Sequence, residues 1–109
     1  MFDFDNDGKL DIISTNGFEI PSTTLDDIMY NGKDNIKLWR NRGIDQKMKD
    51  VSGETGMKFD GMGRGLIVID HDNDGDEDVL LVANVGPPKF FNNKGGNRNN
   101  WIKIRPMHK

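Results

Sequence analysis

The sequence predicts an all-β protein of short antiparallel strands, and three observations support this class. Helices are disfavoured because the 109 residues include thirteen glycines and a single alanine, with a mean hydropathy of -0.71. Short runs rich in β-branched and aromatic residues recur between polar turns. An acidic sequence of nine residues also occurs twice, each time followed by such a run. We therefore expect strands that are joined by acidic loops.

Both copies of the acidic sequence keep the pattern Asp-x-Asp-Asn-Asp-Gly-x-x-Asp. Residues 3–11 read Asp-Phe-Asp-Asn-Asp-Gly-Lys-Leu-Asp, and residues 70–78 read Asp-His-Asp-Asn-Asp-Gly-Asp-Glu-Asp. Carboxylates this close repel one another by about 1 kcal/mol per pair at contact distance in water, and by more near a protein surface. A cation among them would remove that repulsion, so each copy is a candidate cation site.

Calcium suits this pattern because it accepts six to eight oxygen ligands in flexible geometry. In each loop the first, third, fifth and ninth residues would donate carboxylate oxygens, and the seventh its backbone carbonyl. The glycine in sixth place would turn the loop. The predicted ligands of two calcium ions are Asp3, Asp5, Asp7, Lys9 and Asp11 in the first loop, and Asp70, Asp72, Asp74, Asp76 and Asp78 in the second.

An EF-hand is excluded because it needs an acid in twelfth place and a helix on each side. The twelfth residues here are Ser14 and Leu81. The flanking segments 12–13, 65–69 and 79–82 are rich in Ile, Val and Leu and are expected to be strands. The loops are therefore predicted to be strand-loop-strand sites. The alternative is a pair of solvated turns that bind no ion.

The remaining elements follow in chain order. Residues 38–43 (Leu-Trp-Arg-Asn-Arg-Gly) correspond to residues 90–95 (Phe-Phe-Asn-Asn-Lys-Gly), which predicts a further strand in each unit. The first unit is longer, and its extra residues lie within about 17–37, where Pro21 to Ile28 has the order of a helix start. Residues 50–56 are expected to form a capped turn. The glycine run at 61–65 leads into a strand, so we interpret it as a tight entry into a sheet and not as a phosphate-binding loop.

Composition excludes several classes of site. No cysteine occurs, which removes disulfides, thiolate metal sites and cysteine nucleophiles. No segment has the apolar length of a membrane span and no leader precedes the first loop, so we expect neither membrane insertion nor a signal peptide in this chain.

The C-terminal region is basic although the net charge of the chain is -3. Residues 87–109 hold no acid, and we expect either a solvated surface or a patch for a polyanion such as an acidic glycan. The basic residues are Lys89, Lys94, Arg98, Lys103, Arg105 and Lys109.

The paired loops, the runs at 38–41 and 90–93 and the segment 79–84 together resemble FG-GAP/VCBS repeats. These repeats are the blades of calcium-loop β-propellers, as in integrin α-subunit heads. Residues 99–105 (Asn-Asn-Trp-Ile-Lys-Ile-Arg) are similar to the start of an ASPIC/UnbV domain. The resemblance implies antiparallel blades of a partial β-propeller, about two repeats, in an extracellular protein.

The resemblance also implies a domain organisation. Residues 1–56 would be a first repeat, 57–98 a second, and 99–109 the start of a truncated ASPIC/UnbV-like segment. Met1 and Phe2 leave no room for the strand that precedes the first loop in the family, and the tail ends before a further domain could form. We therefore expect a fragment of a longer protein whose neighbouring blades are among its partners.

The predicted function is a non-catalytic, calcium-binding structural or adhesion module of a larger secreted or cell-surface protein. Its partners would be proteins or acidic glycans, without nucleic acid. One alternative is a polyanion-binding surface in the basic C-terminal region. A less favoured one is a phosphoryl-transfer enzyme, because Asp3-Phe4-Asp5 and Asp70-His71-Asp72 resemble the nucleophile loop of haloacid-dehalogenase-like phosphatases. Duplication argues against catalysis, since a nucleophile loop has no reason to occur twice.

Overall fold

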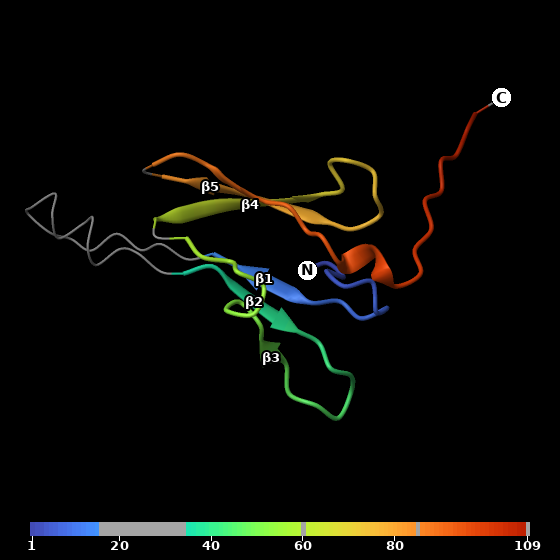
Figure 1. Cartoon of the computed structure of the whole chain (residues 1–109), viewed down its shortest axis with the longest axis horizontal. Coiled ribbons are helices and arrows are strands. Elements are labelled where there is room, and N and C mark those ends of the chain that lie inside the picture. The colour runs from blue at the N-terminus through green and yellow to red at the C-terminus, as the bar shows by residue number, and fades with distance from the viewer. Residues whose placement is uncertain (16–34, 60, 85, 109) are drawn as a thin grey trace, which may run out of the picture.

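The computed structural model describes residues 1–15, 35–59, 61–84 and 86–108, and it confirms the all-β class. These residues form two antiparallel sheets of three strands each and one short 3-10 helix, η1 (Gly96–Arg98). Figure 1 shows the two sheets one above the other, with the N-terminal loop beside η1. Within the described ranges no helix has the length and apolar character needed to cross a membrane.

The first sheet follows the first acidic loop. It consists of β1 (Ile12–Ser14), β2 (Lys37–Arg40) and β3 (Lys49–Asp50), in that order. In the register, Ile12 lies opposite Trp39, which in turn lies opposite Asp50. The predicted strands at 12–13 and 38–41 are thus confirmed, whereas the two-residue strand β3 was not predicted.

The second sheet lies on both sides of the second acidic loop. It consists of β4 (Gly63–Ile69), β5 (Asp78–Ala83) and β6 (Lys89–Phe91). β4 and β5 pair from Ile69 opposite Asp78 to Gly63 opposite Ala83, with an irregularity near Gly65. The strands predicted at 65–69 and 79–82 are confirmed, and β6 overlaps the start of the run 90–95 in which a further strand was predicted.

In both units the residue just before the acidic loop pairs with the last residue of that loop. A single bridge joins Phe2 to Asp11, in the place where Ile69 pairs with Asp78 in the second unit. β5 and β6 correspond to β1 and β2. Among the described residues of the first unit, the Phe2–Asp11 bridge stands at the place of β4.

One hydrophobic core lies between the two sheets. Alternate residues of each strand face it, because successive side chains of a strand point to opposite faces. The most buried positions come from both units, so the sheets stabilise each other. The buried core residues are Phe2, Ile36, Leu38, Val51, Phe59, Val79 and Leu81.

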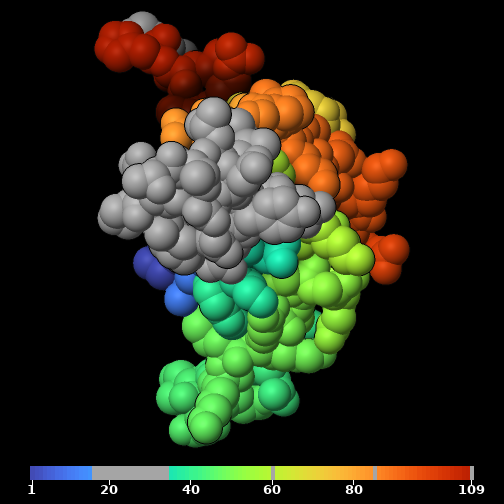
Figure 2. All heavy atoms as spheres, turned by 90° about the vertical axis from the view of Figure 1, so that its left-hand side faces the viewer, coloured from blue at the N-terminus to red at the C-terminus, as the bar shows by residue number. Residues whose placement is uncertain are grey.

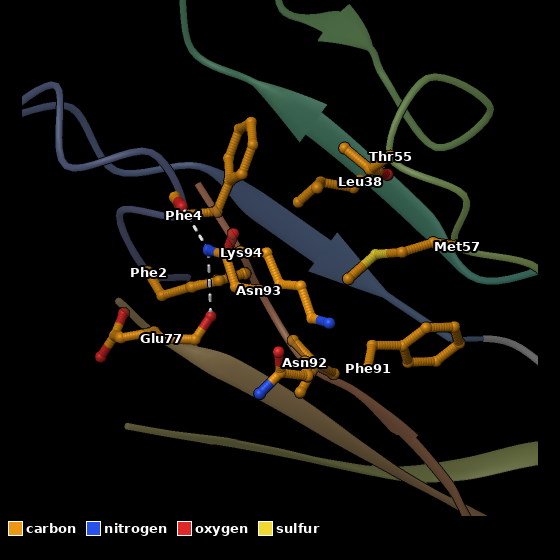
Figure 3. A pocket seen from close by; sticks show the side chains of 11 residues that line it. Phe2, Phe4, Leu38, Thr55, Met57, Glu77, Phe91, Asn92, Asn93 and Lys94 are labelled. Atoms are coloured by element: carbon orange, nitrogen blue, oxygen red, sulfur yellow. Dashed lines mark hydrogen bonds between the residues drawn. The ribbon is translucent and has the colours of Figure 1, made fainter. Parts of the chain in front are cut away.

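A cavity of about 310 Å³ remains between the sheets. Figure 3 shows Phe4, Leu38, Met57 and Phe91 lining it, with the side chain of Lys94 extending between them. Its lining combines apolar side chains of the core with the polar side chains of Glu77, Asn93 and Lys94, so it lies beside the core and opens toward the surface.

The outer faces of the two sheets differ in polarity. The first carries an ion pair between Lys37 and Asp50, with Nζ and Oδ2 3.1 Å apart. The second is apolar: Ile67, Leu80 and Phe90 lie side by side across its three strands, and Ile67 is 50% and Phe90 43% exposed. The second sheet therefore leaves an apolar face uncovered.

Two segments project from the body. Figure 2 shows the loop between β2 and β3 at one end and the C-terminal residues at the other. Residues 101–108 form no strand or helix, so the ASPIC/UnbV-like segment stays a prediction. The insertion at about 17–37 and its helical turn at 21–28 lie almost entirely outside the described residues, and the boundaries after residues 56 and 98 stay predictions.

The predicted capped turn after β3 is confirmed. Asp50 Oδ1 accepts hydrogen bonds from the backbone N–H of Ser52 at 3.0 Å and from its hydroxyl at 2.6 Å. These bonds, Ser52 first, lower the pKa of Asp50 to about 2. The Ser52 hydroxyl oxygen in turn accepts from the N–H of Leu38, and so ties the turn to β2.

Candidate metal centre

The two acidic loops share an unusual backbone conformation. Asn6 and Asn73, in fourth place, have φ of 51° and 62°, and Gly8 and Gly75, in sixth place, have φ of 84° and 94°. Positive φ is strained for most residues but accessible to glycine and tolerated by asparagine. The predicted turning role of the glycines is confirmed, and the asparagines have a matching one. Equal conformations at equal positions indicate one loop fold built twice.

The ninth residue closes each loop by the same hydrogen bonds. Asp11 accepts from the N–H of Phe4 at 3.0 Å and from the N–H of Asn41 at 2.7 Å. Asp78 accepts from the N–H of His71 at 3.2 Å and from the N–H of Asn93 at 2.8 Å. Each buried carboxylate therefore joins the start of its loop to the end of a strand in the same sheet.

The two closing carboxylates differ in proton affinity. Burial raises the pKa of Asp11 above its ordinary value, although the N–H groups of Asn41 and Phe4 oppose the shift. Burial acts in the same direction on Asp78, but hydrogen bonds from His71 and Asn93 outweigh it and leave the pKa lowered. The pKa values differ in direction because His71 bonds to Asp78 through its side chain, whereas Phe4, at the same place of the first loop, has no side-chain donor.

Two equivalent asparagines support the closing carboxylates. The side-chain amides of Asn41 and Asn93 donate to the carbonyls of Leu10 and Glu77, at 3.1 and 3.4 Å. Their side-chain oxygens accept from the N–H of the glycine two residues later. The correspondence of 38–43 with 90–95 therefore extends to hydrogen bonding.

Three carboxylates of the first loop converge. One oxygen from each of Asp3, Asp5 and Asp11 lies within 4.8 Å of the others. Asp3 also accepts from the N–H groups of Asp7 and Gly8, which holds the loop closed. Asp5 Oδ1 is buried and has no hydrogen-bond partner among the described residues. Burial raises the pKa of Asp5, since the charged form lacks solvation.

Asp7 points toward two basic side chains of the same unit. Lys9 Nζ lies 2.8 Å from Asp7 Oδ2, and this hydrogen bond lowers the pKa of Asp7. Arg40 Nη2 lies 2.5 Å from Asp5 Oδ2 and 3.5 Å from Asp7 Oδ2. Part of the repulsion within the loop is therefore offset by the protein's own cations. Neither the side chain of Lys9 nor Arg40 was predicted to take part.

The second loop brings together Asp70, Asp72 and Asp74, with one oxygen of each within 4.8 Å of the others. Asp70 Oδ1 is buried without a hydrogen-bond partner in the described part of the chain. Asp5 Oδ1 is in the same state, although Asp5 stands third in its loop and Asp70 first, so each loop has one such oxygen at a different position. Asp78 lies apart from this trio and groups with His71 and Asp72.

Asp76 was predicted to contribute only its backbone carbonyl to a calcium site, but its side chain is also notable. Its side chain is 1% exposed, and neither carboxylate oxygen has a hydrogen-bond partner among the described residues. Burial, followed by the charge of Asp74, raises the pKa of Asp76. The side chain lies against Gly96 of η1, where an added Cβ would come within 2.8 Å of the Asp76 Cβ. A buried carboxylate in this state indicates that a proton or a cation belongs beside it.

His71 also departs from expectation. Alternation along the loop places its ring away from the acidic ligands, but Nδ1 lies 2.5 Å from Asp78 Oδ2. The ring meets Phe90 edge-on, with centroids 4.7 Å apart. The turn conformation of the loop breaks the alternation that holds in strands.

We expect a pKa above 6.5 for His71 in the metal-free protein, because its imidazole bonds to Asp78 and lies near Asp72. The folded state favours the protonated ring, so this contribution to stability is complete below about pH 6.5 and is lost as pH rises through the folded pKa. Proton NMR of the ring against pH measures it, and Asp78→Asn should lower it. A value at or below 6.5 in the unmodified chain would contradict the contact.

Side-chain amides connect the two loops. Asn6 Nδ2 donates to the carbonyls of Gly75 at 2.9 Å and Gly96 at 3.0 Å. Asn93 Nδ2 donates to the carbonyl of Phe4 at 2.7 Å, a bond drawn in Figure 3. Asn99 Nδ2 donates to the carbonyl of Asp5 at 2.8 Å. The candidate sites are therefore held as one unit by bonds between distant parts of the chain.

The donor set fits calcium. All the converging groups are hard carboxylate oxygens, and each loop has one oxygen in its trio, of Asp5 or of Asp70, that is buried without a proton donor among the described residues. Asp3, Asp5 and Asp11 could hold one ion, and Asp70, Asp72 and Asp74 another. Asp7 and Asp78 lie outside these trios, and the ligand roles of all ten predicted residues stay predictions.

Sequence reasoning missed the residues that reach the loops from elsewhere. The equivalence of Asn41 and Asn93 could have been predicted, because each is the fourth residue of the corresponding runs 38–43 and 90–95. The ion pairs of Arg40 could not, because the spacing of residues does not give the direction of a long side chain.

Comparisons with known proteins identify the family of the chain. A family model described as an FG-GAP-like repeat matches residues 3–81. A curated relative, cartilage acidic protein 1 from Xenopus tropicalis, is 29% identical over 113 aligned positions. The match covers 98% of this chain and 16% of the relative, so the chain spans less than a fifth of that protein's length. No solved structure matches.

Proposed function

The chain belongs to the FG-GAP-like repeat family, and on that premise we propose that it is a calcium-binding structural module without catalytic activity. The observation that carries the proposal is that each loop holds a buried carboxylate oxygen without a proton donor in the described ranges, Asp5 Oδ1 in the first and Asp70 Oδ1 in the second, each within a trio of carboxylates. Calcium would supply the charge that such oxygens require.

The ions would act by holding shape. Each loop connects segments that face the shared core, and each ends on a buried aspartate that binds the neighbouring strand. A calcium ion bound by the carboxylate trio of a loop would hold that loop closed in addition to these hydrogen bonds. Family membership supports a structural role, because these repeats serve as structural units.

We place the module outside the cell as part of this proposal. FG-GAP repeats are typical of extracellular proteins, and millimolar calcium in that compartment suits sites of modest affinity. Adhesion to a protein or acidic glycan would be the corresponding role, and adjoining repeats of a longer chain would be its neighbours.

The polyanion-binding alternative stays a prediction. Two of the six basic side chains are engaged within the chain: Lys89 Nζ donates to the carbonyl of Lys58, and Lys103 Nζ contacts the second loop. Lys94 and Arg98 are exposed and could meet an anion. A phosphatase activity has no support beyond the resemblance of the two Asp-x-Asp segments.

Calorimetric titration with calcium tests the proposal. We expect a stoichiometry near two for the intact chain, because both trios of carboxylates are present. Asp5→Asn and Asp72→Asn should each remove one site, while Asp45→Asn, an exposed aspartate away from the loops, should leave both. No binding heat at millimolar calcium, with the variants indistinguishable, would refute calcium binding.

A further inference from the structure

We propose that residues 99–103, here called the C-terminal strap, act as a tethered counter-ion that competes with calcium for the second loop. The inference rests on the proposed calcium site and adds a regulatory contact to it. Lys103 Nζ bonds to Asn73 Oδ1 and lies 3.7 Å from Asp70 Oδ2. The strap therefore brings a positive charge to the first residue of the predicted ligand set.

Two further contacts hold the strap on the second loop, next to the residues that Lys103 reaches. Trp101 packs on Gly75, whose missing side chain leaves the space for the indole, so that an added Cβ would collide with the ring. Just before the strap, Asn97 Nδ2 donates to Asp74 Oδ2 at 3.0 Å, and Asn99 within it bonds to Asp5. These contacts hold the strap over the second loop and along the edge of the first.

The contact is specific to the second loop. Gly8, equivalent to Gly75, has no atom within 4 Å of the position of an added Cβ. The first loop has its own ammonium, because Lys9 in seventh place binds Asp7. The second loop has Asp76 in that place, and so its lysine arrives from the strap. Each loop thus has one lysine, from a different source.

Competition follows from charge and space. A calcium ion on Asp70 repels the ammonium of Lys103, and both need oxygen atoms of the same residue. Calcium binding would therefore move Lys103 away from the loop and weaken the seat of Trp101 on Gly75. Conversely, a docked strap would lower the calcium affinity of the second site. The first site, where Lys103 has no contact, would be unaffected.

Tryptophan fluorescence provides a direct readout. The chain has two tryptophans, so Trp39→Phe leaves Trp101 as the sole emitter. In this background without calcium, Lys103→Gln should shift Trp101 emission to longer wavelength, because the indole loses its seat and meets more water. Arg105→Gln removes the same charge from an exposed residue without a described contact on the loops, and should leave the emission unchanged.

Calcium titration then tests the competition. Trp101 emission should change in step with the filling of the second site measured by calorimetry. Exposed ion pairs are worth at most about 1 kcal/mol, so Lys103→Gln should raise the calcium affinity of that site roughly two- to fivefold, with Arg105→Gln close to the unmodified chain.

The outcomes separate the two proposals. Two calcium sites with steady Trp101 emission, and equal affinities in the Lys103 and Arg105 variants, would overturn the strap and leave the proposed function standing. If calcium-binding heat at the second site were seen in Lys103→Gln but not in the unmodified chain or in Arg105→Gln, the competition would be strongly supported. Absence of binding heat in every variant would overturn both.

Discussion

Replacing Asp78 with alanine is expected to lower the free energy of unfolding by about 3 kcal/mol or more. Asp78 is buried and accepts hydrogen bonds from the N–H of His71, from His71 Nδ1 and from the N–H of Asn93. A donor left without a partner out of reach of water costs about 1–3 kcal/mol, and the lower end applies to these part-buried bonds. Loss of the buried carboxylate adds a void. Asp11→Ala removes two such bonds and should cost about 2–4 kcal/mol.

Urea unfolding in the presence of chelator measures these changes without any contribution from metal. Asp45→Ala is the matched control, because this aspartate is exposed, and it should stay within about 0.5 kcal/mol of the parent. Asp78→Asn keeps one acceptor oxygen and should fall between. If Asp78→Ala unfolds at the same urea concentration as Asp45→Ala, the carboxylate does not close the loop.

Removing calcium with a chelator is expected to lower the melting temperature by several degrees. A ligand that binds only the folded state stabilises it by about 1.4 kcal/mol per site at ten times its dissociation constant. For a domain of this size each 1 kcal/mol shifts the melting temperature by about 4–8 °C. The effect should be large because two open three-stranded sheets share one small core.

The control for this shift in melting temperature is a variant that lacks both proposed calcium sites. Asp5→Asn combined with Asp72→Asn should melt at one temperature with or without calcium. Superimposable curves for the unmodified chain, at calcium concentrations that saturate any calorimetric signal, would contradict a stabilising role for the ion.

The sequence was sufficient for the strands beside each loop. Runs such as Leu66 to Ile69 and Val79 to Val82 combine β-branched composition with a duplicated boundary, and the structure has strands there. Gly8 and Gly75 were also predictable, because the tight loop needs positive φ at those positions. These predictions depended mainly on the repeat, because the same pattern of loop and strand residues occurs in both copies.

The contacts that surround the loops could not be predicted in the same way. Lys103 reaches Asp70 across a long stretch of chain, and no local pattern gives the direction of its flexible side chain. The burial of the Asp76 carboxylate depends on the position of η1, which the glycine and asparagine composition of residues 93–99 does not specify as a helix. Side-chain placement within a recognised loop therefore depended on tertiary packing.

The amide bonds between the loops bear on how the protein can be dissected. Asn6 contacts Gly75 and Gly96, and Asn93 reaches back to Phe4, so the beginning of the first unit is seated on the end of the second. Cleavage near residue 57 would yield two halves that each expose broken amide contacts and half a core. Expression of a lone repeat is consequently a poor route to its properties, whereas mixing the two halves should restore the assembly by complementation.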